Sequence, residues 1–486
     1  MADLVLEPLR FAGAAAGEET RVLTGRFEPG VGDWAYLPVE VPEGVRELAV
    51  RYSYDRPTPP TGVAGNALDI GVFDRHGRSL GDAAGFRGWS GGSRDRFAIS
   101  RTDATPGYLP GPVGQGTWHV ILGPYTIAPQ GMHWTVEVTL RFGEPGPAFP
   151  PHPAPQRARG RGRAWYRGDL HLHTVHSDGA RTPEELVAGA RAAGLDFIGS
   201  TEHNTSSASL VWGRHAGPEL LIVDGEEVTT RNGHLLALGL PAGAWIDWRY
   251  RAVDGALDRF LRRIHAAGGL AVAAHPYCPF LGCSWRFGER GLDAVEVWNG
   301  PWTADDEVAL RDWDGMLAAG ARSGRWLPAV ANSDAHREPQ VVGLPHNVVL
   351  AGDLDRRSVL GGVRLGRLWM AESAAVDLAF TASGGGRTAG IGGRLAAGPG
   401  QPVTARLEVH GAPGRLVRLF TDLGQVLETR LPDGGPGMVE WATTPQRSAY
   451  VRAEVRRPEA TATTPDPVVA LTNPVFLGAV IGRPPA

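Results

Sequence analysis

The chain has 486 residues, of which 42% are hydrophobic and 21% are charged, and its formal net charge is −4. This composition is typical of a soluble globular protein, and the length exceeds what one hydrophobic core usually supports, so we expect several domains. All 48 basic residues are arginine. That excludes a P-loop lysine, a Schiff-base lysine and pyridoxal-phosphate chemistry, and the small net charge indicates no polyanionic partner.

Residues 1–143 are predicted to form an N-terminal β-sandwich or jelly roll, because short runs bounded by Gly, Pro and Asp follow one another at regular spacing. Residues 133–142 alternate between apolar and polar side chains, as a half-buried strand does. Trp34, Trp89 and Trp118 are candidates for sugar binding, although core or interdomain packing is the stronger interpretation. The other expected strands are at 21–27, 34–41, 48–54 and 68–74.

Residues 144–164 are rich in proline and then in arginine and glycine, which predicts an extended, semi-rigid linker. The arginines of 157–163 could contact nucleic acid, but a solvated linker is the favoured interpretation. Without a broader basic patch we expect no nucleic-acid partner.

Residues 165–375 change character, because strand-like runs alternate with helical ones. Thr182 followed by Pro183 and Glu185 predicts a capped helix over 183–193. A second helix is expected where Leu257, Phe260, Leu261 and Ile264 share one face. Repeated strand–helix units favour a parallel sheet that closes into a barrel. Most of the strand-like runs end in His, Asp or Glu, so we expect these side chains to meet at one rim.

Residues 376–486 are again strand-rich and are predicted to form a small C-terminal β-sandwich. We expect it to pack against the barrel or to complete a homodimer, and no chemistry is assigned to it. Its expected strands are at 403–409, 416–420, 450–455 and 469–477.

The central region carries a set of metal-ligand residue types. His171 and His173 are two residues apart in a strand, so their imidazoles can point to the same side, and Asp178 follows in the turn. Mixed imidazole and carboxylate ligands suit zinc, manganese or iron, and the set is large enough for two or three divalent ions. Glu227 is the most plausible bridging ligand. The predicted metal ligands are His171, His173, Asp178, His203, Glu227, His234, His275, Asp334 and His336.

At these positions the sequence resembles the polymerase and histidinol phosphatase (PHP) family of metallohydrolases. The similarity covers roughly residues 165–375. Glu202, where the family has aspartate, together with Asn204 and the flanking β regions, resembles the carbaryl-hydrolase-like branch. The five motifs occur in order at His171–His173 with Ser177–Gly179, Thr201–Asn204, Gly225–Thr229 with Gly233–His234, His275–Pro276 and Ser333–His336.

The resemblance implies a distorted (β/α)7 barrel, flanked here by two β-sandwich domains, and a di- or trinuclear metal site. It implies one ion on His171, His173, Glu227 and Asp334, a second on Glu227, His234 and His275, and a third on Asp178, His203 and His336. Glu202 is expected to orient a ligand imidazole or a bound water. The predicted catalytic residues are Asp178, Glu202, His203, Arg231 and His336.

The expected chemistry is hydrolysis of a small-molecule ester by a hydroxide that bridges two ions. A phosphate mono- or diester is the first hypothesis, with Arg231 and Arg337 as candidate clamps for the phosphoryl group. His176 and His215 are candidate proton donors, although an uninvolved loop histidine is the stronger interpretation of each. Candidate pocket walls, which packing explains equally well, are Trp212, Tyr277, Trp298 and Trp302.

Two other functions stay open. One is hydrolysis of a carboxylic or carbamic ester or amide, which the carbaryl-hydrolase-like resemblance implies. The other is a non-catalytic carbohydrate- or surface-binding protein, which the intact ligand set disfavours.

The two cysteines, Cys278 and Cys283, share one loop and lack a second Cys-x-x-Cys pair. We expect two reduced, packed thiols, with a local thiol ligand as the alternative. The N-terminus lacks a basic stretch followed by an apolar one, and no run of about 18 apolar residues occurs. We therefore expect a cytoplasmic protein without a membrane partner.

Overall fold

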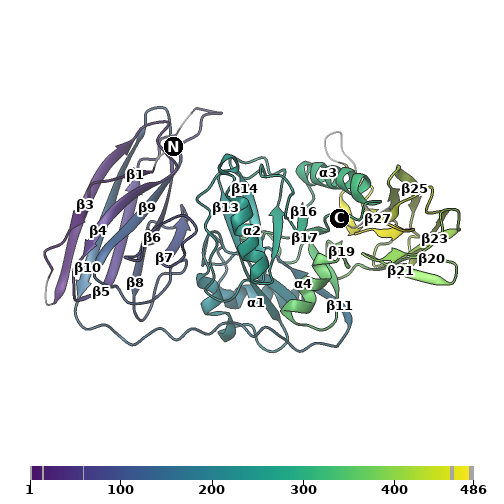
Figure 1. The fold of residues 1–486 in the computed structure, drawn as a ribbon, viewed down its shortest axis with the longest axis horizontal. Coiled ribbons are helices and arrows are strands. Elements are labelled where there is room, and N and C mark those ends of the chain that lie inside the picture. The colour runs from purple at the N-terminus through teal and green to yellow at the C-terminus, as the bar shows by residue number, and fades with distance from the viewer. Residues whose placement is uncertain (1–2, 14–15, 59, 460–464, 481–486) are drawn as a thin grey trace, which may run out of the picture.

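The computed structural model describes residues 3–13, 16–58, 60–459 and 465–480. Three regions lie side by side along the long axis: N-terminal sheets, a central unit that contains the helices, and C-terminal sheets (Figure 1). Among the described residues, no helix is long and apolar enough to cross a bilayer.

The N-terminal region consists of two sheets that pack face to face. Leu37 and Val39 face the core between the sheets, whereas their neighbour Tyr36 faces the central unit. The first sheet is therefore buried on both faces. Its order is β1-β4-β9-β6-β7 with β2 beside β4, formed by β1 (Leu4–Val5), β2 (Leu9–Arg10), β4 (Ala35–Val41), β6 (Ala67–Phe73), β7 (Phe86–Gly91) and β9 (Gly116–Thr126). The second has the order β3-β10-β5-β8, formed by β3 (Gly17–Phe27), β5 (Val45–Tyr54), β8 (Arg96–Ser100) and β10 (Met132–Phe142).

The segment from residue 144 to 163 runs extended beneath the N-terminal and central regions to reach β11 (Figure 1). It is held along its length, because His152 N donates to Leu210 O at 2.7 Å and Ala158 N donates to Leu354 O at 3.0 Å. The segment is therefore fixed to the surface of the central unit by backbone hydrogen bonds.

The central unit is built on a curled, mixed sheet of order β17-β16-β15-β14-β13-β12-β11-β18-β19. Its strands are β11 (Ala164–Asp169), β12 (Phe197–Ser200), β13 (Leu221–Thr230), β14 (Gly233–Leu238), β15 (Leu270–Ala274), β16 (Ala294–Asn299), β17 (Ala329–Asn332), β18 (His346–Ala351) and β19 (Leu368–Ala371). Its helices are α1 (Pro183–Ala192), α2 (Leu257–Ala266), α3 (Ala304–Gly320) and α4 (Arg356–Arg364), with short 3-10 turns at Ser207–Leu210, Trp212–Arg214 and Ala252–Asp254.

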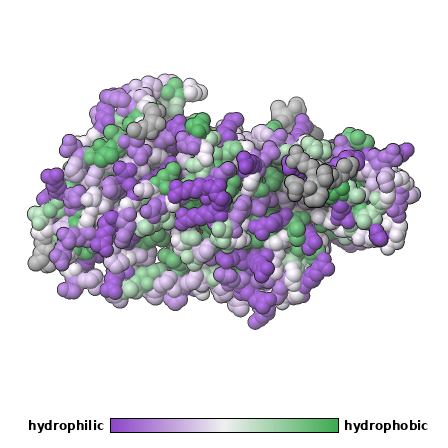
Figure 2. Space-filling model, viewed as in Figure 1, coloured by the Kyte–Doolittle hydropathy of each residue, from purple (hydrophilic) through white to green (hydrophobic). Residues whose placement is uncertain are grey.

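The predicted helices at α1 and α2 are confirmed. Thr182 caps α1 with a complete capping box, and α2 buries the apolar face expected from the sequence. The opposite face of α2 is polar and exposes Asp258, Arg259 and Arg262. In the same view, Figure 2 shows hydrophilic residues over the middle of the molecule, where Figure 1 places α2.

The sheet is not a clear (β/α)7 barrel, so that prediction is corrected. β14 is antiparallel to both β13 and β15, and β18 is antiparallel to β11 and β19. The physical reason is connection length, because only Arg231 and Asn232 separate β13 from β14. A parallel crossover needs about a dozen residues, whereas this connection permits only a hairpin.

Asparagine side chains close the curl between β17 and β18. Asn347 Nδ2 donates to Ala331 O at 2.6 Å, and Ala331 N donates to Asn347 Oδ1 at 3.0 Å. Asn332 Oδ1 accepts from Leu170 N at 2.7 Å, which joins β17 to the end of β11. The half-barrel therefore brings the ends of β11 and β17 together without a continuous backbone ladder.

Part of the C-terminal region continues the central sheet, and the rest forms a sheet of its own. β28 pairs with β19, for example Trp369 with Thr472. The strands that extend the sheet are β24 (Leu416–Thr421), β25 (Gly424–Arg430), β27 (Tyr450–Arg456) and β28 (Val468–Thr472). β29 (Val475–Leu477) pairs with β27, and β22 (Arg394–Leu395) pairs with β29. A separate sheet has the order β21-β20-β23-β26, formed by β20 (Asp377–Gly384), β21 (Arg387–Gly390), β23 (Val403–His410) and β26 (Gly437–Thr443).

Candidate metal centre

The predicted ligands meet at one edge of the curled sheet. Glu227 lies in β13 and His234 in β14, so the β13–β14 hairpin presents both from adjacent strands. The others follow the ends of neighbouring strands: His171, His173 and Asp178 after β11, His203 after β12, His275 after β15, and Asp334 and His336 after β17.

Glu227 is the centre of this cluster and is completely buried. Its Oε1 lies 2.8 Å from His234 Nδ1 and 3.1 Å from His275 Nε2. Its Oε2 lies 3.3 Å from the Nε2 atoms of both His171 and His173. One carboxylate thus faces two sets of imidazoles, as a bridging ligand does.

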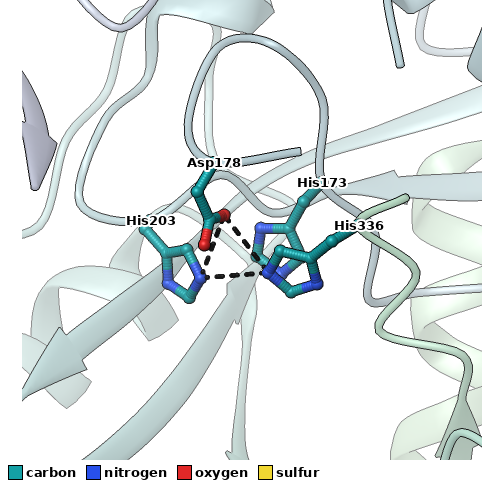
Figure 3. Close-up of side chains that lie close together, drawn as sticks. All are labelled: His173, Asp178, His203 and His336. Carbon is teal, nitrogen blue, oxygen red and sulfur yellow. Dashed lines mark hydrogen bonds and ion pairs between the residues drawn. The ribbon is translucent and has the colours of Figure 1, made fainter. Parts of the chain in front are cut away.

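Asp178 forms the outer part of the cluster with three imidazoles (Figure 3). Its Oδ1 lies 3.5 Å from His203 Nε2 and 3.2 Å from His336 Nε2, and His173 lies behind them. Asp334 lies between this part and the inner one, with Oδ1 3.0 Å from His173 Nε2. The ligand atoms form four overlapping groups: His173–Asp178–His203–His336, His171–His173–Glu227, His171–His275–Asp334 and His234–His275–Cys283.

The residues fit metal ions, because the atoms that would bind them face one another and have no partners outside the cluster among the described residues. These buried atoms form no hydrogen bond with the described part of the chain, and all point into the cluster: His171 Nε2, His173 Nε2, Asp178 Oδ1, Glu227 Oε2 and Asp334 Oδ1. Buried polar atoms without partners are rare and costly. Imidazole nitrogen with carboxylate oxygen is a ligand set for zinc, manganese or iron.

Electrostatics keeps the carboxylates ionised. Burial alone would raise the pKa of Glu227, but the imidazoles of His203, His171 and His234 hold it well below its ordinary value. Burial would likewise raise the pKa of Asp334, which His171 and His173 hold far below its ordinary value. Against burial, Glu227 and Asp178 raise the pKa of His203 to about 10. The cluster attracts positive charge, and metal cations can take the place of these protons.

Backbone strain is concentrated at the same place. Outside glycine, the positive φ angles of the described residues are those of Asn204 (54°), His275 (24°) and Asp334 (49°). Two of these are predicted ligands and the third adjoins His203. Such conformations cost about 1–3 kcal/mol each and are typical of functional sites.

Buried carboxylates behind the ligands hold them in place, and sequence reasoning missed two of them. Glu296 Oε1 lies 3.1 Å from His171 Nδ1, and its Oε2 accepts from His275 N at 2.8 Å. Asp169 accepts from the backbone of Ser333, and burial raises its pKa to about 7. The available signal was an acidic residue within or at the end of an apolar strand, where burial demands a partner.

Glu202 lies behind the loop that carries Asp178. Its carboxylate accepts from Thr174 N at 3.1 Å and from Ser177 Oγ at 2.5 Å. Ser177 Oγ in turn lies 3.4 Å from His173 Nδ1. Glu202 therefore positions a ligand loop and a ligand imidazole.

A cavity of about 820 Å³ opens beside the cluster. Asp178, His203 and His234 line its inner end, and Arg231 and Arg337 line it as well. Most of the rest of the wall comes from the N-terminal region, the segment between β14 and α2, and the loop after His275. It includes Trp34, Asp69, Trp89, Ser90, Ser93, Tyr125, Trp248, Phe280 and Leu281.

The cavity has aromatic residues in its wall, but they are not the ones predicted from the sequence. Trp212 and Trp298 are buried in the core, where their indole nitrogens donate to Ser200 Oγ and Gly300 O. None of the four candidates lines the cavity: Trp212, Tyr277, Trp298 and Trp302. Trp34 and Trp89 do line it, because they pack between the N-terminal sheet and Trp248.

The two candidate proton donors do not line the cavity either. His176 Nδ1 lies 2.9 Å from Ser207 Oγ, and burial lowers its pKa to about 4. His215 lies at the end of the short turn Trp212–Arg214.

Cys278 and Cys283 form a disulfide, which corrects the prediction of reduced thiols. The loop turns back on itself, so the Cα atoms come within 5.6 Å, a separation that a disulfide spans. Cys283 Sγ lies 3.3 Å from His275 Nδ1, so the bridge fixes the loop beside a predicted ligand.

No protein-family model matches the chain. It is 36% identical over 84 residues to a phosphoribosyl 1,2-cyclic phosphate 1,2-diphosphodiesterase of Eggerthella lenta, a match that covers 16% of this chain and 32% of that protein. It is 28% identical over 152 residues to an uncharacterized protein of Methanocaldococcus jannaschii, covering 27% of this chain and 81% of the other.

A two-domain protein from Bacteroides vulgatus, described as containing a predicted PHP-like metal-dependent phosphoesterase, is similar in structure at a TM-score of 0.36. That comparison covers 66% of this chain and 97% of the other at 16% identity. At this TM-score the two folds differ too much to support an argument about this chain.

Proposed function

We propose that the chain is a metal-dependent phosphoesterase that hydrolyses a small phosphate mono- or diester. The observation that carries the proposal is the set of buried, unpartnered ligand atoms around Glu227, which opens onto a cavity that also contains Arg231. The carbaryl-hydrolase-like branch stays a prediction, as do the number and identity of the ions.

The predicted ligands fall into three groups, each of which would hold one ion. His171, His173, Glu227 and Asp334 would hold an inner ion, His234 and His275 would complete a second site with Glu227, and Asp178, His203 and His336 would hold an outer one. Bound divalent ions lower the pKa of water and polarise a phosphoryl oxygen. Glu296 and Glu202 keep the imidazoles oriented during this chemistry.

Arg231 supports an anionic substrate. Its guanidinium lies over the Tyr125 ring, 4.2 Å from the centroid, and its Nε and Nη2 are buried and form no hydrogen bond with the described residues. A planar guanidinium with free N–H groups suits a phosphoryl group, which offers several acceptor oxygens. Arg337 lines the same cavity.

The similarity to a phosphodiesterase also supports this choice. The Eggerthella lenta protein acts on a phosphoribosyl cyclic phosphate, as its name states, and part of it aligns with 84 residues of this chain. The competing chemistry, hydrolysis of carboxylic or carbamic esters, would use the same cluster without needing an anion-binding arginine.

A substrate panel tests the proposal. The full chain, loaded with manganese or zinc and checked by elemental analysis, is assayed with bis(p-nitrophenyl) phosphate, p-nitrophenyl phosphate, p-nitrophenyl acetate and an aryl carbamate. We expect metal-dependent turnover of a phosphate ester. Higher kcat/KM for the carbamate or acetate, or purified protein that binds no metal, contradicts the proposal.

Arg231→Ala sharpens the result. Loss of a positioned charged donor should lower kcat/KM for the phosphate ester about 100-fold and affect the acetate less. Arg96→Ala is the matched control, because Arg96 lies on the N-terminal surface with a 69% exposed side chain.

A further inference from the structure

The N-terminal β-sandwich supplies a polar wall of the cavity that faces the metal cluster. Asp69 projects from β6 into this cavity and is only partly exposed. The next segment of wall is a run of small residues, Ser90–Ser93, at the end of β7. A cavity of about 820 Å³ is large enough for a substrate that extends from the cluster to this wall.

Asp69 has no hydrogen-bond partner among the described residues. The influences on its carboxyl group are burial, which raises its pKa to about 6, and the opposing charges of Arg231 and His203. Gly92 lies beside this carboxylate, since a β-carbon there would be 3.6 Å from Asp69 Oδ1. A carboxylate in such a place accepts hydrogen bonds from whatever occupies the cavity.

Arg231 and Asp69 line the same cavity with opposite charges, yet no salt bridge joins them within the described chain. Stacking explains why Arg231 stays where it is. Its guanidinium is 4.2 Å from the Tyr125 centroid and 5.2 Å from that of Trp34. Tyr125 is itself anchored, because its hydroxyl donates to Leu281 O. The two charged groups are therefore held apart and left free for a ligand.

The complementary ligand has an anionic group toward Arg231 and the cluster and a hydrogen-bond donor toward Asp69. A neutral hydroxyl fits better than an ammonium group, because Arg231, Arg337 and the bound cations would repel a second positive charge. Ser90 and Ser93 line the same wall, but their hydroxyl groups already bond to Tyr108 OH and to the carbonyl oxygens of Ser90 and Ser177, which leaves the carboxylate of Asp69 as the acceptor of this wall.

We propose that Asp69 forms a subsite for the alcohol part of the substrate next to the phosphoryl-binding Arg231, and that the substrates are phosphate esters of hydroxylated alcohols, glycerol-like or sugar-like. This inference rests on the proposed phosphoesterase function. Arg231 binds a phosphoryl oxygen, and Asp69 accepts a hydrogen bond from a hydroxyl group of the alcohol. The N-terminal domain is thus a specificity domain, and Asp69 is its selective residue.

The test compares two diesters that differ only in hydroxyl groups, p-nitrophenyl glyceryl phosphate and p-nitrophenyl propyl phosphate, on the metal-loaded full chain. We expect the wild type to favour the glyceryl ester in kcat/KM. Because a hydrogen bond to a charged group changes binding about 10- to 100-fold, Asp69→Ala should reduce the glyceryl-to-propyl ratio by that factor. Asp69→Asn preserves the size of the side chain and one acceptor oxygen, so it should reduce the glyceryl-to-propyl ratio less. This variant also provides a test if the alanine variant does not fold.

Asp95→Ala is the control, because Asp95 lies outside the cavity wall with a 69% exposed side chain, and it should retain the wild-type ratio. Equal kcat/KM for the two esters in the wild type, or an unchanged ratio in Asp69→Ala, overturns the subsite. Preference for the 3-aminopropyl ester over the glyceryl ester overturns the hydroxyl assignment.

A binding measurement separates this inference from the proposed function. Calorimetry with glycerol 1-phosphate and propyl phosphate gives the ratio of their binding constants, which measures the preference for the hydroxylated alcohol without turnover. A wild type that hydrolyses bis(p-nitrophenyl) phosphate but binds both monoesters equally refutes the subsite alone. A wild type that binds glycerol 1-phosphate selectively through Asp69 but hydrolyses no phosphate ester refutes the proposed reaction alone.

Discussion

The two β regions that flank the metal cluster are attached to it in different ways. The C-terminal region is joined by backbone, since β28 continues the central sheet from β19. The N-terminal region is joined by side chains: Trp34 and Trp89 pack on Trp248, and Arg249 Nη1 donates to Tyr36 OH at 2.8 Å. Within the described chain, no strand ladder connects its sheets to the central one.

This difference matters for the cavity. Its lining residues fall between Trp34 and Arg337, so the N-terminal region contributes to the wall and the described part of the C-terminal region does not. A domain docked by side chains over the open edge of the cluster can alter the wall without disturbing a ligand. A domain that extends the sheet stabilises the cluster from behind.

Glu227→Gln removes the centre of the metal cluster. Its loss of kcat/KM is the largest expected effect, and the effects of variants in the two β regions are compared with it. The amide cannot balance the imidazoles that surround it or bridge two ions, so we expect kcat/KM to fall about 1000-fold or more and bound metal to be lost. Steady-state kinetics and elemental analysis measure the two effects. Glu219→Gln, at a side chain 66% exposed, should change neither. Normal metal content with normal turnover would refute the central role of Glu227.

Trp89→Ala tests the side-chain junction. Trp89 is buried, with its ring centroid 4.5 Å from that of Trp248, so truncation should lower the free energy of unfolding by about 3–5 kcal/mol. Because Trp89 also lines the cavity, kcat/KM should fall even where the variant is folded. Trp441→Ala, in the C-terminal region, should lower stability alone. Equal kinetic effects of the two variants would remove the distinction between the regions.

Arg452→Ala tests the C-terminal junction. Arg452 is buried and donates to Glu454 at 2.6 Å and to Asp314 of α3 at 2.7 Å. Removing it leaves buried carboxylates without their partner, so unfolding should become easier by about 3–5 kcal/mol, measured by denaturant titration. kcat/KM at a temperature where the variant is folded should stay at the wild-type value. Arg406→Ala, at an exposed arginine, is the control. A loss of turnover as large as that of Trp89→Ala would contradict the comparison.

His346→Gln tests how the free energy of unfolding depends on acid at β18, the strand next to β19. His346 Nδ1 donates to Gly343 O, and Arg167, which also donates to Val376 O, donates to its Nε2, so the buried ring is neutral. Burial lowers its pKa from 6.5 to about 4. The unfolded chain therefore takes up this proton first as the pH falls.

The stability that neutral His346 contributes is complete above pH 6.5 and is lost as the pH falls toward 4. The loss is on the order of 2–3 kcal/mol. Unfolding of His346→Gln should depend less on pH in that window, whereas His410→Gln, at an exposed histidine, should match the wild type. An identical pH dependence of unfolding in His346→Gln and the wild type would show that His346 does not cause the acid loss.

Local patterns predicted many elements well. The alternating run at 133–142 is β10, and the capping residues before Pro183 start α1. The predicted strand at 469–477 is instead two strands, β28 and β29, because Asn473 and Pro474 interrupt the ladder. Patterns of this kind depend on neighbours in sequence, so sequence alone reveals them.

The barrel prediction failed for a reason that was visible in the sequence. The runs that became β13 and β14 are too close together for a crossover helix, and this spacing required a hairpin. The aromatic wall failed for a different reason. Burial and exposure of Trp212 or Trp34 depend on which faces pack together, and composition does not show that.

The sequence by itself determined the chemistry of the ligands, because histidines and carboxylates placed at successive strand ends converge wherever those strands share a sheet. Only the tertiary structure decided what surrounds them: Glu296 behind His171, the asparagines that close the curl, and Asp69 in the cavity that Arg231 also lines. The physical reason is that strand ends are brought together by directional backbone hydrogen bonds between paired strands, whereas the docking of one domain on another depends on non-directional packing between side chains of their surfaces.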